Sequence, residues 1–277
     1  MAELGKYNRL TINRFVDFGA YVDGGELGEI LVPQKYLPED IEEDDEIDVF
    51  VHLDSEERYV ATTEEVKAQV GECAMMEITA TSAHGAFADW GLVKNLFIPF
   101  REQRFKLLEG DTPVIYVYVD EITNRLAGST KIENYIKYDS SDFREKERVK
   151  VLIYRKTPSG YLAIIENKCL GMIYSNQVFR KLKIGDTVTA FIKKIRDDNK
   201  VDLTLQEEGY GKVRDFSDEL YNYLLEHGET TLNDKSAPED IKQQFGVSKK
   251  VFKQAVGKLY KQKKILLGKG KISLSQS

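Results

Sequence analysis

A pattern of short apolar strands that recurs three times before residue 207 constrains the fold of this chain more than any other feature. Each copy opens with an alternating strand that runs into a glycine turn and an aromatic residue, at Arg14–Tyr21, Thr81–Phe87 and Lys156–Tyr161. A short apolar strand follows, at Glu29–Pro33, Asn95–Pro99 and Gly171–Tyr174. Self-similarity of this kind indicates tandem copies of one structural unit.

Each copy continues with a turn, a long strand, an acidic turn and a closing strand. The long strands are expected within Asp44–Val51, Glu109–Tyr118 and Ile184–Ile192, and the closing segments are Asp54–Val60, Asp120–Leu126 and Asp197–Leu203. Short, evenly spaced strands separated by turn signals predict a small all-β unit. Closure into a barrel removes the exposed strand edges, and Gly19, Gly85 and Gly160 fit a strongly bent strand.

These copies predict three barrel domains, at residues 1–64, 65–130 and 145–206, with residues 131–144 as an ordered connector. No helical pattern of ten or more residues interrupts the strands, and this excludes parallel βαβ units.

The period of the apolar pattern changes in residues 210–277. Phe216, Leu220, Tyr223 and Leu224 recur at helical spacing, and Gly228 is a helix stop. Ser236 and Glu239 predict a capping box for a second helix that contains Ile241 and Phe245. Ser248 is expected to cap a third helix with the apolar stripe Phe252, Ala255, Val256 and Leu259, before two short strands, Ile265–Leu267 and Lys271–Leu274. Three helices and a hairpin in this order are typical of a winged-helix domain, with the second and third helices as a helix-turn-helix unit.

The repeated order of strand, glycine, aromatic residue, short strand and Gly-Asp turn resembles the S1-type RNA-binding domain, which is an OB barrel. Three such units before a winged helix are similar to the conserved virulence factor B (CvfB-like) family, over nearly the whole chain. The resemblance implies a mostly-β fold of tandem five-stranded S1-type OB barrels followed by an α+β winged-helix domain. It also implies RNA binding and a post-transcriptional or virulence-type regulatory role.

Charge is distributed unevenly along the chain. Residues 1–64 hold 5 Lys and Arg against 17 Asp and Glu, a net charge of −12, and residues 65–130 hold 6 against 9, a net charge of −3. Residues 145–206 hold 13 against 7, or +6, and residues 210–277 hold 13 against 8, or +5. This gradient indicates a polyanionic partner for the second half of the chain.

OB folds bind single strands by stacking bases on aromatic rings and by placing cations along the phosphates. The resemblance puts stacking rings at the glycine turn, where the copies have Phe18 with Tyr21, His84 with Phe87, and Ser159 with Tyr161, which stands one position early. It implies a further site residue on the next strand, where the copies align as Val32, Ile98 and Tyr174. The RNA-contacting residues predicted here are Phe18, Tyr21, Arg58, Phe87, Arg125, Tyr161, Lys168, Tyr174, Lys193, Lys194, Lys200, Lys250, Lys253, Lys258, Lys261 and Lys269.

The third copy is expected to bind most strongly, because its charge is +6 and several phosphate contacts control affinity. Packing within the core is the alternative role for each of these aromatic rings. The basic face of the third helix is expected to contact the phosphate backbone with little base readout, because lysine reads base edges less well than arginine or asparagine.

No catalytic motif, metal-ligand spacing or phosphate loop occurs in the sequence, so we expect no enzyme activity, no metal and no cofactor. Cys73 and Cys169 are expected to be buried, reduced thiols. The chain has no apolar stretch that would span a bilayer and no signal segment, and this predicts a cytoplasmic protein. The leading partner is single-stranded RNA, with no membrane and no small-molecule substrate. The alternatives are duplex DNA bound by the winged helix, and a scaffold whose acidic first barrel contacts a ribosomal or other basic protein.

Overall fold

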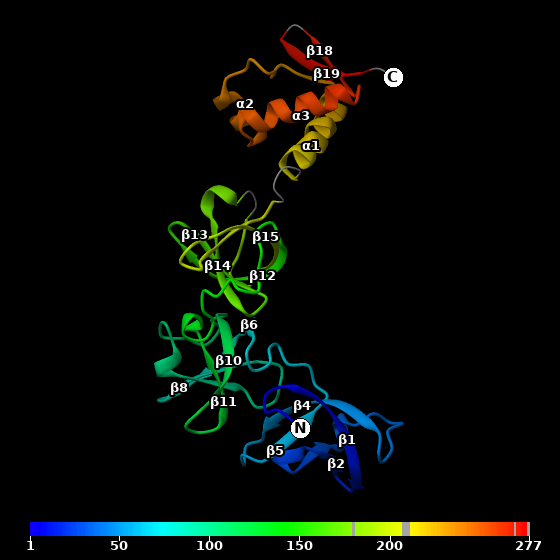
Figure 1. Ribbon diagram of the computed structural model, residues 1–277, viewed down its shortest axis with the longest axis vertical. Coiled ribbons are helices and arrows are strands. Elements are labelled where there is room, and N and C mark those ends of the chain that lie inside the picture. Colours follow the sequence, from blue (N-terminus) through cyan, green and yellow to red (C-terminus); the bar gives the residue numbers. More distant parts are fainter. Residues whose placement is uncertain (179–180, 207–210, 269, 276–277) are drawn as a thin grey trace.

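The computed structural model describes residues 1–178, 181–206, 211–268 and 270–275, with side chains of the first helix described from Phe216 onward. Three β domains and one helical domain follow one another in chain order, from the N-terminal barrel in blue to the C-terminal domain in orange and red (Figure 1). Among the helices in the described ranges, none combines the length and apolar character that crossing a membrane requires.

The first and third domains are closed five-stranded barrels of identical topology. The first has β1 (Tyr7–Val16), β2 (Gly19–Asp23), β3 (Glu29–Pro33), β4 (Glu46–Leu53) and β5 (Tyr59–Thr62), in the closed order β1-β2-β3-β5-β4. The third has β12 (Arg148–Thr157), β13 (Gly160–Ile165), β14 (Cys169–Tyr174), β15 (Thr187–Ile195) and β16 (Val201–Thr204), in the closed order β12-β13-β14-β16-β15. The predicted barrels are confirmed in these two domains.

The second domain differs from the expected five strands, because its first strand is broken. Its sheet has the order β6-β10-β11-β9-β8-β7, formed by β6 (Cys73–Met75), β7 (Ile78–Thr81), β8 (Gly85–Ala88), β9 (Leu96–Pro99), β10 (Val114–Asp120) and β11 (Arg125–Ser129). β6 pairs with β10, as β1 pairs with β4, and β7 pairs with β8, as β1 pairs with β2. Together β6 and β7 therefore take the place of the single strand β1. The first strand also changes register within β1 and β12, so the break is a stronger form of a bend present in all three domains.

The three predicted glycine positions are places where two backbones approach closely. A Cβ on Gly19 would lie 2.1 Å from the carbonyl oxygen of Val32, and one on Gly160 would lie 2.1 Å from that of Ile173. A Cβ on Gly85 would lie 2.3 Å from the carbonyl oxygen of Ile98. Any side chain at these positions would push the second strand away from the third, which is the physical reason for glycine here.

The C-terminal domain has the predicted winged-helix order. It consists of α1 (Gly211–His227), β17 (Glu229–Thr230), α2 (Pro238–Phe245), α3 (Lys249–Lys261), β18 (Ile265–Gly268) and β19 (Lys271–Leu274), with a sheet in the order β17-β19-β18. The predicted apolar stripes of α1 and α3 pack into one core. The two-residue strand β17 was not expected, because it is too short to show an alternating pattern.

The predicted caps of the two short helices have different outcomes. Ser248 caps α3, and its hydroxyl accepts a hydrogen bond from the N–H of Val251 at 3.4 Å. The capping box at Ser236 is wrong: Ala237 is the residue before α2, and its side chain makes no capping bond. Pro238 occupies the first turn of α2 and moves the cap to Ala237, while the Ser236 hydroxyl accepts from the N–H of Asn233 at 2.9 Å in the preceding turn.

Phe50 joins the first barrel to the second. It lies on β4, where Val49, Phe50 and Val51 are all buried and the usual alternation is lost. The Phe50 ring is fully buried in the core of the second barrel and lies 5.5 Å from the Trp90 ring, edge to face. On its other side the ring lies 5.3 Å from that of Tyr7.

A second apolar cluster joins the second barrel to the third. Cys73 and Val114 from the second barrel, Ile132 from the connector, and Leu162 and Ile164 from the third barrel are buried in it together. Residues 131–144 are therefore an ordered connector. Both cysteines are unpaired and buried, as predicted, and burial raises the pKa of the Cys169 thiol to about 11.

We predict that Phe50→Ala lowers the free energy of unfolding of the first two barrels by about 3–5 kcal/mol, the usual cost of removing a fully buried ring. Urea denaturation of the full chain measures this change. Phe18→Ala is the control, because Phe18 is 58% exposed and its removal leaves no cavity. A loss of stability no larger than that of the control would contradict the shared core.

Candidate nucleic-acid interface

A cleft of about 810 Å³ lies where the first and second barrels meet. Two half-buried rings line it, Phe87 on β8 and Phe97 on β9. These residues face each other directly across the two strands, with ring centroids 5.3 Å apart. The exposed His84 stands at the turn before β8 and also lines the cleft. The cleft therefore offers flat apolar surface of the kind on which unpaired bases stack.

Three cations line the same cleft. Arg101 follows β9, Arg125 begins β11, and Lys94 precedes β9. With the acids Glu57 and Asp120, also in the lining, the local sum is three positive charges against two negative charges, or +1. The lining of the cleft is thus close to neutral, although both barrels carry net negative charge.

Each of these cations already has a partner in the protein. Arg125 forms an ion pair with Glu57 of the first barrel, and both side chains are about half exposed. Arg101 forms an ion pair with Asp120. The carboxylate of Asp120 also accepts backbone N–H bonds from Thr123 and Ile122, and these bonds, with Arg101, hold its pKa below its usual range.

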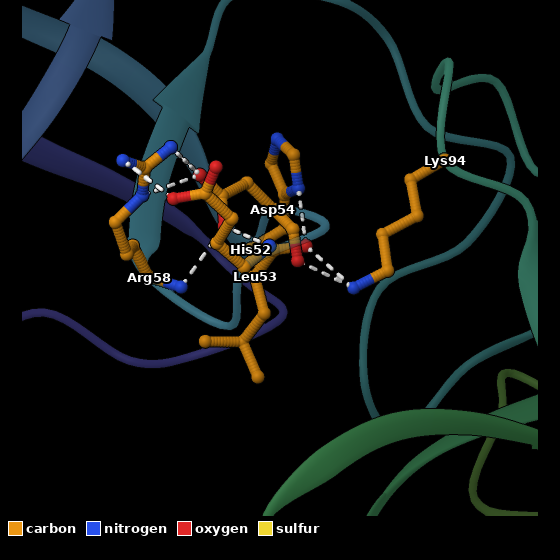
Figure 2. A network of polar contacts seen from close by, with 6 residues as sticks. His52, Leu53, Asp54, Arg58 and Lys94 are labelled. Carbon is orange, nitrogen blue, oxygen red and sulfur yellow. Dashed lines mark hydrogen bonds and ion pairs between the residues drawn. The ribbon is translucent and has the colours of Figure 1, made fainter.

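Lys94 reaches across the barrel junction to the turn after β4. Its ammonium group donates to the carbonyl oxygens of Leu53 and Asp54, at 3.2 and 2.6 Å (Figure 2). Partial burial lowers the pKa of Lys94, because the surroundings stabilise its charge less than water does. His52 lies beside this contact, and burial likewise lowers its pKa.

Arg58, the predicted RNA-contacting cation of the first barrel, forms ion pairs with two acids of its own turn. Figure 2 shows its guanidinium group on the side of Asp54 away from Lys94. It contacts the carboxylates of Asp54 at 2.6 Å and Glu56 at 3.0 Å. A phosphate near Arg58 therefore meets two carboxylates as well.

The two predicted rings of the first barrel are differently placed. Phe18 is 58% exposed at the turn between β1 and β2. Tyr21 is half-buried, and the guanidinium group of Arg14 lies 4.3 Å from its ring centroid, in an ion pair with Glu29. Only Phe18 therefore presents an uncovered face among these two.

Strand register shows the one-residue offset of Tyr161 in the third copy. Tyr21 pairs with Leu31 and Phe87 pairs with Phe97, two residues after the shared turn glycine in each barrel. The third-barrel residue at this position is Leu162, which is buried against the second barrel. Tyr161 precedes it and packs against the core of its own barrel.

The predicted equivalence of Val32, Ile98 and Tyr174 is wrong by one residue. Tyr174 pairs with Gly160, as Pro33 pairs with Gly19 and Pro99 with Gly85. The Tyr174 hydroxyl accepts a hydrogen bond from Arg196 at 2.6 Å. The position that carries rings in the other two barrels is Leu162 in the third, where it is buried in the cluster that joins the second and third barrels, while the expected contacts of Tyr161 and Tyr174 with RNA remain predictions.

The predicted lysines lie mostly on the surface. Lys193 and Lys194 are exposed on β15, while Lys168 and Lys200 contact Asp142 at 3.4 Å and Asp198 at 2.6 Å. On α3, Lys250, Lys253 and Lys261 are exposed and Lys258 is half-buried. Lys269 lies outside the described residues. Their contacts with nucleic acid remain predictions.

Three residues of the cleft were missed by the sequence analysis: Lys94, Phe97 and Arg101. Phe97 had a detectable signal, because it lies between the buried Leu96 and Ile98 on a strand with two-residue alternation. Lys94 lies in the turn before β9 and Arg101 in the short 3-10 helix Phe100–Glu102, where the two-residue alternation of a strand does not apply.

Sequence comparisons identify domains at both ends of the chain. The S1 domain family matches residues 4–64, and the CvfB-like winged helix domain family matches residues 218–274. The Bacillus subtilis protein YitL is 27% identical over 274 residues, which cover 94% of this chain and 90% of that protein. Conserved virulence factor B of Staphylococcus aureus (strain USA300) is 27% identical over 208 residues, covering 72% of this chain and 69% of that protein.

A crystal structure of a multidomain protein with nucleic acid binding domains from Streptococcus pneumoniae TIGR4 is 24% identical to this chain. The match covers 98% of each chain with a TM-score of 0.42.

The matched domain families bind nucleic acids and are not catalytic. The predicted resemblance to the CvfB-like family is thereby confirmed, with an S1 domain at residues 4–64 and a CvfB-like winged-helix domain at residues 218–274.

Proposed function

We propose that this protein binds single-stranded RNA with low sequence specificity, and that the cleft beside the second barrel is its main contact surface. The observation that carries the proposal is the pair of half-buried rings, Phe87 and Phe97, beside Arg101 and Arg125. The matched S1 domain supports nucleic-acid binding in general.

The cleft favours unpaired bases over a duplex. Each base that stacks on an aromatic ring contributes about 1–3 kcal/mol, and every base has a flat face, so the contact tolerates any sequence. Bases in a duplex are already stacked on each other and cannot reach recessed rings. The amide group of Asn95, which could read a base edge, instead donates to the Thr79 hydroxyl at 2.9 Å.

A non-catalytic regulatory role in the cytoplasm completes the proposal. It is supported by the similarity to proteins named conserved virulence factor B and by the binding character of both matched domain families. The winged helix contributes exposed lysines on α3, which suit backbone phosphates of RNA or of duplex DNA.

Binding of a short unstructured RNA and of a duplex DNA, compared by fluorescence anisotropy at low salt, tests the proposed function. We expect the RNA to bind more tightly. Absence of RNA binding at low salt would end the proposal, and strong selectivity for the duplex would assign the function to the winged helix instead.

We predict that Phe87→Ala and Phe97→Ala each weaken RNA binding by about 5- to 100-fold, which corresponds to removing about 1–3 kcal/mol of stacking. Anisotropy titrations measure this change, and thermal unfolding checks that each variant remains folded. Phe15→Ala is the control, because Phe15 is a partly exposed ring on β1 that does not line the cleft. Equal weakening in all three variants would remove the cleft from the binding surface.

Glu57→Gln is expected to strengthen RNA binding several-fold, because it removes an acid from the cleft and releases Arg125 for a phosphate. The neighbouring Glu56→Gln removes the same charge but is paired with Arg58 outside the cleft lining, so it is the matched control. If both variants bind RNA equally well, the effect is one of net charge and the contact with Arg125 plays no part.

Lys250→Glu combined with Lys253→Glu is expected to weaken RNA binding. The slope of log affinity against log salt should also fall by about 0.7 for each phosphate that the protein no longer neutralises. Titrations at several salt concentrations measure the slope. Lys181→Glu combined with Lys183→Glu makes the same charge change on exposed positions of the third barrel and is the control. An unchanged slope would exclude α3 from the binding surface.

A further inference from the structure

We propose that a second cavity, between the second and third barrels, binds a nucleotide, with the phosphate at Arg104 and Arg155 and the base against Phe105. The assignment of that nucleotide to the same RNA strand rests on the proposed function. The nucleotide site itself does not.

The cavity has a volume of about 300 Å³ and is lined from both barrels. This volume lies at the lower end of the range of about 300–1,000 Å³ that is usual for small-molecule sites. Val114, Ile132 and Tyr154 form apolar lining that belongs to the cluster joining the two barrels. Part of the cavity wall is thus held by a buried interface.

Two arginines of the cavity share a single carboxylate partner. Arg104 and Arg155 line the cavity, and both form ion pairs with the single carboxylate of Glu133. Asp111 is the acid in the lining, and its carboxylate accepts the N–H of Leu108 at 2.8 Å. The lining residues carry two positive charges and one negative charge, and Glu133, which pairs with both arginines, brings the local sum to zero.

One donor atom of Arg155 also lacks an acceptor. Its Nε atom is buried, and no atom of the described residues accepts a hydrogen bond from it. Buried donors in proteins are nearly always paired, so Glu133 leaves part of the hydrogen-bonding capacity of this guanidinium group unused, and a ligand with acceptor oxygens can use that capacity. A phosphate supplies several such oxygens in the geometry that a guanidinium group matches.

The cavity rim favours an organic phosphate over an inorganic ion. Phe105 is 56% exposed and Ile184 is 45% exposed, and both line the cavity. An exposed ring next to two guanidinium groups offers stacking for a base and ion pairing for its phosphate, the combination used by single-strand binding surfaces.

The path of the chain connects this cavity to the cleft beside the second barrel. Arg101 lines the cleft and Arg104 lines the cavity, and three residues of chain span at most about 11 Å. The ammonium group of Lys131 donates to the carbonyl oxygen of Arg101 at 2.6 Å. A strand that leaves the cleft past Arg101 therefore meets Lys131 and then Arg104 at the cavity.

Two measurements on the full chain test the proposal, with the variants Arg155→Gln and Phe105→Ala. The first is calorimetric titration with adenosine 5′-monophosphate. The second is anisotropy with RNA oligonucleotides of about 6 and about 15 nucleotides, which bracket the usual size of an OB-fold site. Arg148→Gln on the same strand as Arg155, and Leu108→Ala close to Phe105, are the matched controls because both residues are exposed and do not line the cavity.

We expect the wild type and both controls to bind the mononucleotide, and Arg155→Gln to weaken this binding about tenfold because it removes a charge-assisted hydrogen bond. Phe105→Ala is expected to weaken it as well. Because Phe105 is exposed, this variant remains informative even if Arg155→Gln loosens the junction. Both variants should weaken binding of the long RNA and leave binding of the short RNA unchanged.

The remaining outcomes separate the two proposals. If the wild type binds RNA but the mononucleotide does not bind, or binds equally well to the cavity variants, the nucleotide site is overturned and the proposed function stands. If the mononucleotide binds in the cavity and no RNA binds, the site is kept and the proposed function fails. If the cavity variants lose only mononucleotide binding, the connection to the RNA strand is overturned.

Discussion

The cleft depends on the contact between Phe50 and the core of the second barrel. A small barrel has its own core and gains nothing from an apolar ring on its outer face unless that ring is buried elsewhere. Phe50 is buried against Trp90, and the position of the first barrel is fixed around this contact by the polar bonds of Lys94. The exposed ion pair of Arg125 with Glu57 adds little stability, so the buried apolar ring is the main contact that holds the junction.

Burial of outer-face apolar residues at the junctions also explains why three similar barrels present different surfaces. The second barrel covers the face of the third that contains Leu162, and the residues buried there cannot contact a partner. The face of the second barrel with Phe87 and Phe97 lines an open cleft instead. The junctions thus decide which faces of each barrel stay accessible, and the net charge of a repeat does not show this.

Local sequence signals predicted the elements but not their junctions. Alternation located the strands, close backbone approach explains Gly19 and Gly160, and helical periodicity located the buried stripe of α3. The site was harder to predict, because the alignment of Tyr174 with Val32 and Ile98 was off by one residue and a one-residue shift reverses the direction of a strand side chain. Phe50 gave no local sign of its role, since a ring within an apolar strand reads as core of that same strand.

The charges of the cleft explain why rings, and not cations, would decide what is bound. Asp120 is fixed by backbone N–H bonds, so Arg101 keeps its acid and acts as a nearly neutral pair toward a phosphate. Glu57 belongs to an exposed turn of a barrel that carries a net charge of −12, and it opposes any phosphate that approaches Arg125. A duplex would bring phosphates to the cleft but no unpaired bases, so it would gain little binding free energy. A single strand also offers flat bases to Phe87 and Phe97, and this gain can exceed the electrostatic cost. The acidic first barrel would thereby select against duplexes without contacting a single base.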